Sequence, residues 1–192
     1  MASASLGKWK AARALELDRL EAAHVAVGGT GRGRRYATQQ VNQAYVVLLS
    51  SHFQGFCRDL HAEAIDYFVD SIQPPSARVA VRTALAWKRS LDRGNPTPDN
   101  IAADFNRFGM TFWPEVYAVD LGGAKRETAL KELNKWRIAI AHHDFDASKL
   151  AGRTTVTLQM VQRWRSACNG LARSFDRVVS ARITKLTGAK TW

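Results

Sequence analysis

The length, composition and charge of the chain limit what it can be. It has 192 residues, of which 46% are hydrophobic, so it is long enough to bury a core without disulfides or metal ions, and an intrinsically disordered tail is excluded. The formal net charge of +11 favours a polyanionic partner, with RNA or DNA ahead of an anionic membrane surface, over a basic protein without a nucleic-acid role.

The first 35 residues predict a helix followed by a basic loop. Leucines and alanines recur among charged residues from Leu6 to Val27, and Gly28-Gly29 ends this pattern. The next segment, residues 30–35, is rich in glycine and arginine, which is typical of a flexible loop. This loop either contacts an RNA backbone or is an ordinary linker. Its arginines are Arg32, Arg34 and Arg35.

The rest of the chain, residues 36–192, predicts a bundle of helices. Apolar residues recur at three- and four-residue steps in most of it, and an alternating strand pattern never lasts more than a few residues. The segment that carries Phe112, Trp113 and Pro114 is expected to be irregular. We therefore expect an all-α fold, an antiparallel helical bundle with an extra N-terminal helix, in a single compact domain. The expected helices cover residues 36–72, 76–93, 99–108, 125–142 and 157–186.

Two features of the composition point to a cytoplasmic protein. Cys57 and Cys168 are far apart in the sequence, and each lies in an apolar helical pattern, so we expect buried, reduced thiols. The longest strongly apolar run, residues 44–49, is too short to span a bilayer, and the first ten residues lack the apolar core of a signal peptide. We therefore expect a soluble protein of the cytoplasm without a membrane partner.

The end of the helix predicted over 125–142 carries the residues that point most directly to a function. Arg137, His142, His143 and Asp144 follow one another there within an apolar pattern. A guanidinium holds a phosphate through a planar fork of donors, and an imidazole transfers a proton near neutral pH. Together these groups are the minimum that cutting RNA without a metal ion requires.

The spacing of Arg137 and His142 constrains how they can work together. Five residues turn a helix by about 140°, so the two side chains do not share a face of an ideal helix. Either the long arginine curls towards the helix end, or the working pair forms across a two-fold axis between two copies. A purely structural alternative pairs Arg137 with a carboxylate of the bundle and lets His142 cap the last carbonyl groups.

The spacing alone is weak evidence, because Arg19 and His24 show it too. That pair lies on a charged amphipathic helix, where His24 is expected to face solvent near the helix C-terminus. By contrast, the helix that carries Arg137 and His142 is apolar on more than one side. A second row of residues on this helix, spaced four positions apart, consists of Asn134, Ile138 and His142. This row indicates another contact, for example with a second subunit.

Residues 137–142, Arg-Ile-Ala-Ile-Ala-His, resemble the R-x4-6-H signature of HEPN domains, all-α bundles found in many prokaryotic toxins and antiphage effectors. Residues 46–60 are similar to the long early helix of the RiboL-PSP-type branch of this family, where an aromatic and an acidic residue follow a Ser-rich aliphatic run. The resemblance covers roughly residues 36–186. Two positions depart from the pattern of the ribonuclease members: Ile138 replaces a polar residue, commonly Asn, and Gln54 stands at the acidic position of the early helix.

The resemblance implies a metal-independent endoribonuclease of the toxin or antiphage-defence type. It would work as a homodimer, with both motif helices facing one cleft and without a cofactor. Arg137 would hold the scissile phosphate and stabilise its developing charge, and His142 would act as general base or acid on the 2′-hydroxyl or the leaving oxygen. The products would be a 2′,3′-cyclic phosphate and a 5′-hydroxyl. RNA is the expected partner, together with a cognate antitoxin or a regulatory protein.

Further residues are assigned secondary roles. His143 joins the catalytic set, and Asp144 either orients an imidazole or caps the helix end. His52 is either a hydrogen-bonded core histidine or a second imidazole that points into the catalytic cleft. Asn134 is a second-rank member of the catalytic set, and Lys135 is assigned to RNA binding.

The sequence also bears on other functions. Cys57 and His61 share a helix face at a ligand-like spacing, but a metal ion needs three or four converging donors, so no metal site is predicted. The main alternative to the nuclease is a catalytically inactive HEPN module that binds RNA, a nucleotide or a partner protein, which Ile138 and Gln54 favour. A DNA-binding regulator is a third class, for which the sequence offers no convincing helix-turn-helix unit.

Overall fold

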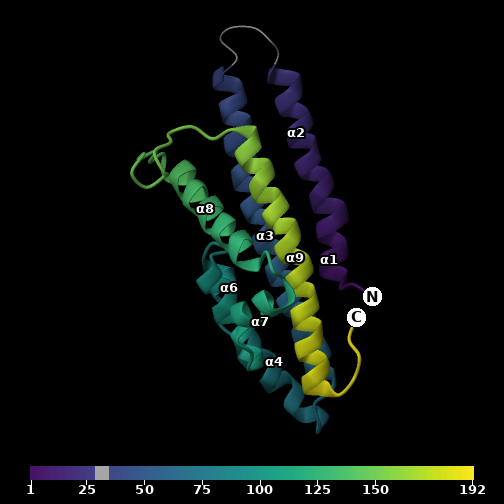
Figure 1. Ribbon diagram of the computed structural model, residues 1–192. Helices are drawn as coiled ribbons and strands as arrows, with labels where there is room; N and C mark the ends of the chain where they lie inside the picture. Colours follow the sequence, from purple (N-terminus) through teal and green to yellow (C-terminus); the bar gives the residue numbers. More distant parts are fainter. Residues whose placement is uncertain (29–34) are drawn as a thin grey trace.

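The structure, a computed structural model, describes residues 1–28 and 35–192, and these ranges form a bundle of helices (Figure 1). They contain no strand, which confirms the all-α prediction. The α-helices are α1 (Ala4–Lys8), α2 (Ala14–Gly28), α3 (Arg35–Asp70), α4 (Arg78–Ala86), α5 (Ser90–Arg93), α6 (Pro98–Phe105), α7 (Phe112–Val119), α8 (Gly123–His142) and α9 (Leu158–Thr187). A π-helical turn joins α1 to α2 at Trp9–Arg13, and 3-10 turns lie at Pro75–Ala77 and Asn106–Phe108.

Four long helices, α2, α3, α8 and α9, carry the bundle, and each runs antiparallel to the one before it in the chain (Figure 1). The central helices α3 and α9 therefore run side by side in the same direction. Asn42 Nδ2 donates to the carbonyl oxygen of Val156 (3.0 Å) near the start of both helices. Further along, the rings of Phe53 and Phe175 pack with their centroids 5.9 Å apart. The sequence did not predict this parallel pairing.

The core contains an aromatic cluster around Phe175 of α9. Its ring contacts Phe53 of α3 and both Phe112 and Trp113 of α7, with centroid distances of 4.8 Å to Phe112 and 5.6 Å to Trp113. Closer to the start of α9, Trp164 packs against Trp136 of α8 at 6.3 Å. Because large rings fill the space between these helices, they set where α7 and α8 lie on the central pair.

The N-terminal helix belongs to the same core. Leu6, Trp9 and Leu17 are buried. Next to Leu17, the carboxylate of Asp18 in α2 accepts a hydrogen bond from Arg165 of α9 (2.7 Å). Since apolar and charged contacts both join residues 1–28 to α3 and α9, the described residues form one packed unit.

The helix predicted over 76–93 is interrupted after Ala86, and tertiary contacts explain the break. Arg107 donates to carbonyl oxygens at the end of α4 and in the break. The buried carboxylate of Asp104 accepts hydrogen bonds from the first two N–H groups of α5, at 2.8 and 2.9 Å. Trp87 lies at the break and is 64% exposed. Side chains that lie far along the chain therefore end α4, which periodicity cannot reveal.

Helix α7 occupies the segment that the sequence predicts to be irregular. Pro114 lies in its first turn, where the N–H group that proline lacks has no helical partner to lose. The N–H of Thr111 donates to Glu115 Oε1 (2.9 Å), and the N–H of Phe112 donates to Asn106 Oδ1 (3.0 Å). These two acceptors satisfy donors at the helix start, so proline does not prevent the helix from forming.

Two predictions from composition can be compared with the structure. Cys57 and Cys168 are both buried and unpaired, as expected. Burial raises the pKa of both thiols, which keeps them protonated. In the part of the chain that the structure describes, no helix combines the length and apolar character that crossing a bilayer requires.

Replacing Phe175 by alanine tests the aromatic cluster. Phe175→Ala removes a fully buried ring and leaves a cavity, so we expect the free energy of unfolding to fall by about 3–5 kcal/mol. Urea denaturation followed by circular dichroism measures this change. The matched control is Leu121→Ala, because Leu121 is fully exposed and its truncation is expected to change stability by less than about 0.5 kcal/mol. Equal effects of the two substitutions would contradict this description of the core.

Candidate functional site

Helix α8 ends in a cap made by the backbone. His143 adopts a left-handed conformation (φ 52°, ψ 36°). Its N–H donates to Ile140 O at 3.3 Å, and the N–H of Asp144 donates to Ala139 O at 2.9 Å. Backbone groups therefore satisfy carbonyl groups at the helix end. The imidazole of His142 does not take the capping role that one interpretation of the sequence gave it.

Arg137 is a half-buried cation without a partner. It lies between Leu130 and Leu133 on the helical wheel, and both leucines are buried. Among the described arginines that are buried or half-buried, Arg137 is the one that makes no hydrogen bond or ion pair. Its guanidinium nitrogens are not sealed from solvent. The others each bind a carboxylate or a carbonyl group: Arg13, Arg78, Arg89, Arg107, Arg126, Arg165 and Arg182.

The missing partner of Arg137 has a consequence for binding. Placing a charge next to apolar residues costs free energy unless a counter-charge or an acceptor compensates it. Every comparable arginine of the described chain has such a compensation within the protein. An anion from outside, such as a phosphate, would supply it at Arg137. The carboxylate of the bundle that the structural alternative assigned to Arg137 is not present among the described residues.

The two histidines at the end of α8 are exposed. His142 makes no hydrogen bond with any described residue, and the ring of His143 packs edge-on against Phe145, with centroids 5.3 Å apart. Arg137 lies on the buried side of α8, whereas His142 lies on the solvent side. Within one copy of the chain, the guanidinium and the imidazole therefore point in different directions, as their spacing predicts.

Asp144 takes neither of the roles predicted for its carboxylate. The carboxylate forms an ion pair with Lys149 at 2.9 Å, in the segment that follows α8. It is the backbone N–H of Asp144, and not the side chain, that contributes to the helix cap. The ion pair is exposed and contributes little to stability, but it draws this segment towards the end of the helix.

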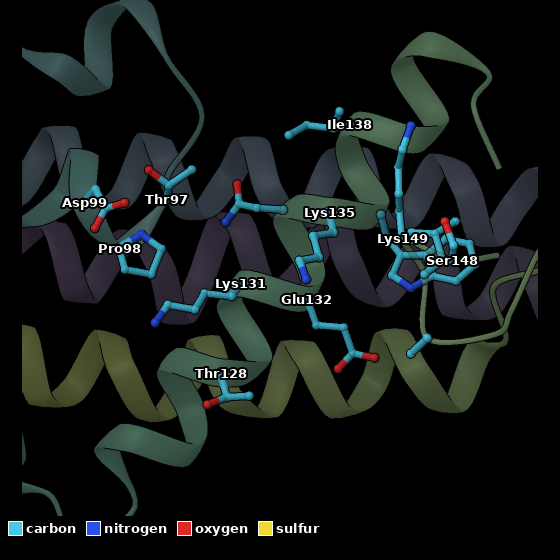
Figure 2. A pocket seen from close by; sticks show the side chains of 14 residues that line it. Thr97, Pro98, Asp99, Thr128, Lys131, Glu132, Lys135, Ile138, Ser148 and Lys149 are labelled. Carbon is cyan, nitrogen blue, oxygen red and sulfur yellow. The ribbon is translucent and has the colours of Figure 1, made fainter. Parts of the chain in front are cut away.

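A hollow of about 710 Å³ lies beside α8 (Figure 2). Thr97 and Asp99, at the start of α6, form one side of it; Lys149, in the segment after α8, forms the other; Lys131 and Lys135 of α8 lie between them. A second hollow of about 330 Å³ continues from it and reaches Asp144, next to the histidines. The residues that line both hollows are Lys135, Ile138, Lys149 and Leu150.

The second row of α8, predicted to make another contact such as one with a second subunit, packs partly within the chain. Asn134 is buried, and its Nδ2 donates to Pro96 O (3.0 Å) and Leu130 O (2.9 Å). Asn134 is therefore a residue of the packed bundle and not of an exposed catalytic set. Ile138, one turn further on, is 42% exposed and lines the hollow beside Lys135, which is exposed as well.

The hollow as a whole has no signature in the sequence. Thr97 and Pro98 come from a segment that lies well before α8 in the chain, and Leu150 comes from the irregular segment after it, so no helical spacing relates them to α8. The signal that was available is the exposed pair Lys131 and Lys135, one turn apart on a helix whose apolar residues already implied several covered faces.

The structure gives His52 and Gln54 roles in packing. His52 Nε2 lies 2.9 Å from Glu16 Oε2 of α2, and burial lowers the pKa of the imidazole against the opposing effect of Glu16. His52 therefore faces the N-terminal helix, as a core histidine does. Gln54 Nε2 donates to the carbonyl oxygens of Leu91 (2.6 Å) and Gly94 (2.9 Å). An ionised carboxylate cannot donate, so an amide suits this position and an acid does not.

The other predicted residues are placed as follows. Arg32 and Arg34 lie outside the described residues, and Arg35 is the first residue of α3. Arg19 is exposed, but His24 is half-buried, with Nδ1 sealed and without a hydrogen-bond partner. His24 therefore faces solvent only in part, because it lines a hollow together with residues from the start of α3.

Cys57 and His61 are both fully buried, and the described ranges hold no group of three metal-ligating side chains that converge. His61 Nε2 lies 3.0 Å from the carbonyl oxygen of Asp104. Burial lowers the pKa of His61 to about 4, with Arg89 and Arg107 acting in the same direction and Asp104 opposing them. His61 is therefore a neutral core histidine between α3 and α6.

Comparison of the chain with protein-family models, with curated proteins and with solved structures gives no match.

The buried imidazole of His61 predicts a stability that depends on pH. The unfolded chain binds a proton at His61 below about pH 6.5, whereas the folded chain does so only below about pH 4, so protonation favours unfolding. As the pH is lowered from about 6.5 to about 4, this group is expected to reduce the free energy of unfolding by about 3 kcal/mol in total. Urea denaturation of the wild type and of His61→Gln at several pH values isolates the effect. The same slope in both proteins would contradict it.

Proposed function

We propose that this protein is a metal-independent endoribonuclease of the HEPN type, acting in the cytoplasm as a toxin or an antiphage effector. The observation that carries the proposal is Arg137, the half-buried arginine without a partner, on the last turns of a helix that ends in two exposed imidazoles. The net charge of +11 supports RNA as the substrate, because phosphate contacts dominate the affinity of nucleic-acid binding.

The chemistry assigned to these residues is an internal transfer at one phosphate. His142 takes the proton of a ribose 2′-hydroxyl, and the 2′-oxygen forms a bond to the adjacent phosphorus. The bond from phosphorus to the 5′-oxygen breaks, and that oxygen receives a proton from an imidazole, from His143 or from His142 of a second copy. Arg137 compensates the negative charge that develops on the phosphate. The products are a 2′,3′-cyclic phosphate and a 5′-hydroxyl, and no metal ion takes part.

A homodimer is part of the proposal, because Arg137 and His142 do not share a face of α8. Two copies related by a two-fold axis place two motif helices against one cleft, so that the guanidinium of one copy and the imidazole of the other reach the same phosphate. A cognate antitoxin or a regulatory protein would restrain such an enzyme by covering the cleft.

The alternative is an inactive HEPN module that binds RNA, a nucleotide or a partner protein. Ile138 favours it, since an apolar residue follows the arginine directly and supplies no group for catalysis. Gln54 carries less weight than the sequence suggested, because its amide has a structural role in holding the carbonyl groups after α5.

Purified protein incubated with total RNA in EDTA tests the proposal. We expect cleavage with 2′,3′-cyclic phosphate ends, a fall in rate of about 10²–10³-fold in Arg137→Ala, and a fall of about 10²–10⁴-fold in His142→Ala. The matched control is Arg19→Ala, an exposed arginine of a similar motif on α2, which is expected to keep the wild-type rate. End-group analysis of the fragments and gel-based rates provide the measurement.

Two results would count against the nuclease. RNA that stays intact at micromolar protein supports the binding module. Cleavage that survives in both Arg137→Ala and His142→Ala would show that the activity does not come from the end of α8.

A further inference from the structure

A small pocket of about 290 Å³ lies between the N-terminal helical segment and α9. On one side it is lined by Lys10, of the π-helical turn, and by Ala14, the first residue of α2. The other side is a stripe of α9 residues at four-residue steps, Arg165, Asn169 and Arg173, which fall within an arc of about 80°. Since π-helical turns are frequent at functional sites, the pocket at this turn is a candidate binding site.

The amide of Asn169 offers hydrogen-bond donors to this pocket. Its Oδ1 accepts a hydrogen bond from Nε1 of the buried Trp9 (2.9 Å), which fixes the orientation of the amide group, because an indole nitrogen only donates. Its Nδ2 has no acceptor among the described residues, and this atom is not sealed from solvent. A ligand that enters the pocket therefore meets an oriented N–H donor that the protein leaves free.

Two cations of the pocket also lack a partner. Lys10 and Arg173 are exposed, and neither forms a hydrogen bond or an ion pair with a residue that the structure describes. Arg165 differs from them, because its guanidinium is paired with two carboxylates of α2 and its charge is compensated within the protein. The side chains of the pocket that keep free hydrogen-bonding groups, Lys10, Asn169 and Arg173, therefore offer donors, and two of them carry a positive charge.

We propose that this pocket binds a small phosphate dianion, as free phosphate or as the phosphate group of a small ester. Lys10 and Arg173 compensate its charge from the two sides, and Nδ2 of Asn169 donates to one of its oxygens. Hydrogen bonds from a cation to a phosphate are about twice as strong as neutral ones. The volume of the pocket is just below the range of about 300–1,000 Å³ that is typical for drug-sized ligands, which suits an ion with few attached atoms.

The site exists only in the folded chain, because its two sides come from segments that lie far apart in the sequence. Phosphate is therefore expected to raise the temperature of thermal unfolding as its concentration rises, as a ligand of the folded state alone does. No residue of the pocket belongs to α8, so the inference goes beyond the proposed nuclease and does not depend on it.

Calorimetry at constant ionic strength tests this inference, with inorganic phosphate, glycerol 3-phosphate and citrate as probes. We expect phosphate to bind at one site per chain. Lys10→Ala and Arg173→Ala are each expected to weaken its binding roughly tenfold, since each removes a charge-assisted hydrogen bond. Asn169→Asp keeps an acceptor for Trp9 but replaces the free donor by a negative charge, so it is expected to weaken phosphate binding by more than tenfold.

The matched control is Lys185→Ala. Lys185 is also an exposed cation of α9 without a partner among the described residues, but it lies outside the pocket. This variant is expected to bind phosphate like the wild type. Lys10 and Arg173 are exposed, so their variants are expected to fold, and thermal unfolding without phosphate checks this. If Asn169→Asp, at a half-buried position, unfolds at a lower temperature, the two exposed positions decide the question.

Each outcome has a defined meaning. Binding of a phosphate compound that Lys10→Ala and Arg173→Ala weaken and Lys185→Ala does not supports the site, and the compound that binds more tightly identifies the ligand as free phosphate or a small ester. Equal binding of citrate, an equal effect of Lys185→Ala, or no binding of phosphate and glycerol 3-phosphate at millimolar concentration would each overturn the proposal. Since the measurement uses no RNA, its result is independent of the outcome for the nuclease.

Discussion

Helix α3 is the element on which the rest of the structure depends, because most of the other helices pack against it. It contacts α1, α2, α4, α5, α6, α8 and α9. Its buried residues include neighbours in the sequence, such as Tyr45-Val46 and Phe56-Cys57, so more than one of its faces is covered. Helices α3 and α9 run in the same direction, and α8, which lies between them in the sequence, runs in the opposite direction. The end of α8 thereby comes to the end of the bundle where α3 and α9 begin (Figure 1). Its two histidines are exposed there.

The distribution of charge partners separates structural cations from candidate binding cations. Arg165 joins α9 to Asp18, and Arg107 holds the break between α4 and α5, so these arginines are occupied within the protein. Arg137 and Lys135, two residues apart on α8, have no such partners among the described residues. One lies at the buried edge of the helix and the other at the rim of the hollow. The proposed nuclease rests on this contrast at Arg137.

Local sequence signals were sufficient for the long helices. Helix α8 was expected over 125–142 and covers Gly123–His142, and α9 begins just after Thr157, whose side chain accepts a hydrogen bond from the N–H of Met160. Apolar periodicity and helix caps are set by neighbouring residues, so they can be read along the chain. The same signals failed where distant groups act. Periodicity continues through residues 76–93, but Arg107 and Asp104 bind the backbone there and divide the helix.

The residue types at the candidate site, and the 140° between Arg137 and His142, follow from the order of amino acids along one helix. Their surroundings do not. Whether an arginine is paired, whether Asp144 meets an imidazole or Lys149, and whether Asn134 faces a second subunit or Pro96 depend on which segments pack beside α8. Those segments are brought there by burial of apolar surface across the whole bundle, a sum over many contacts that has no local signature. The hollow beside α8 is the clearest case, because three separate segments form its walls and each carries an unremarkable sequence.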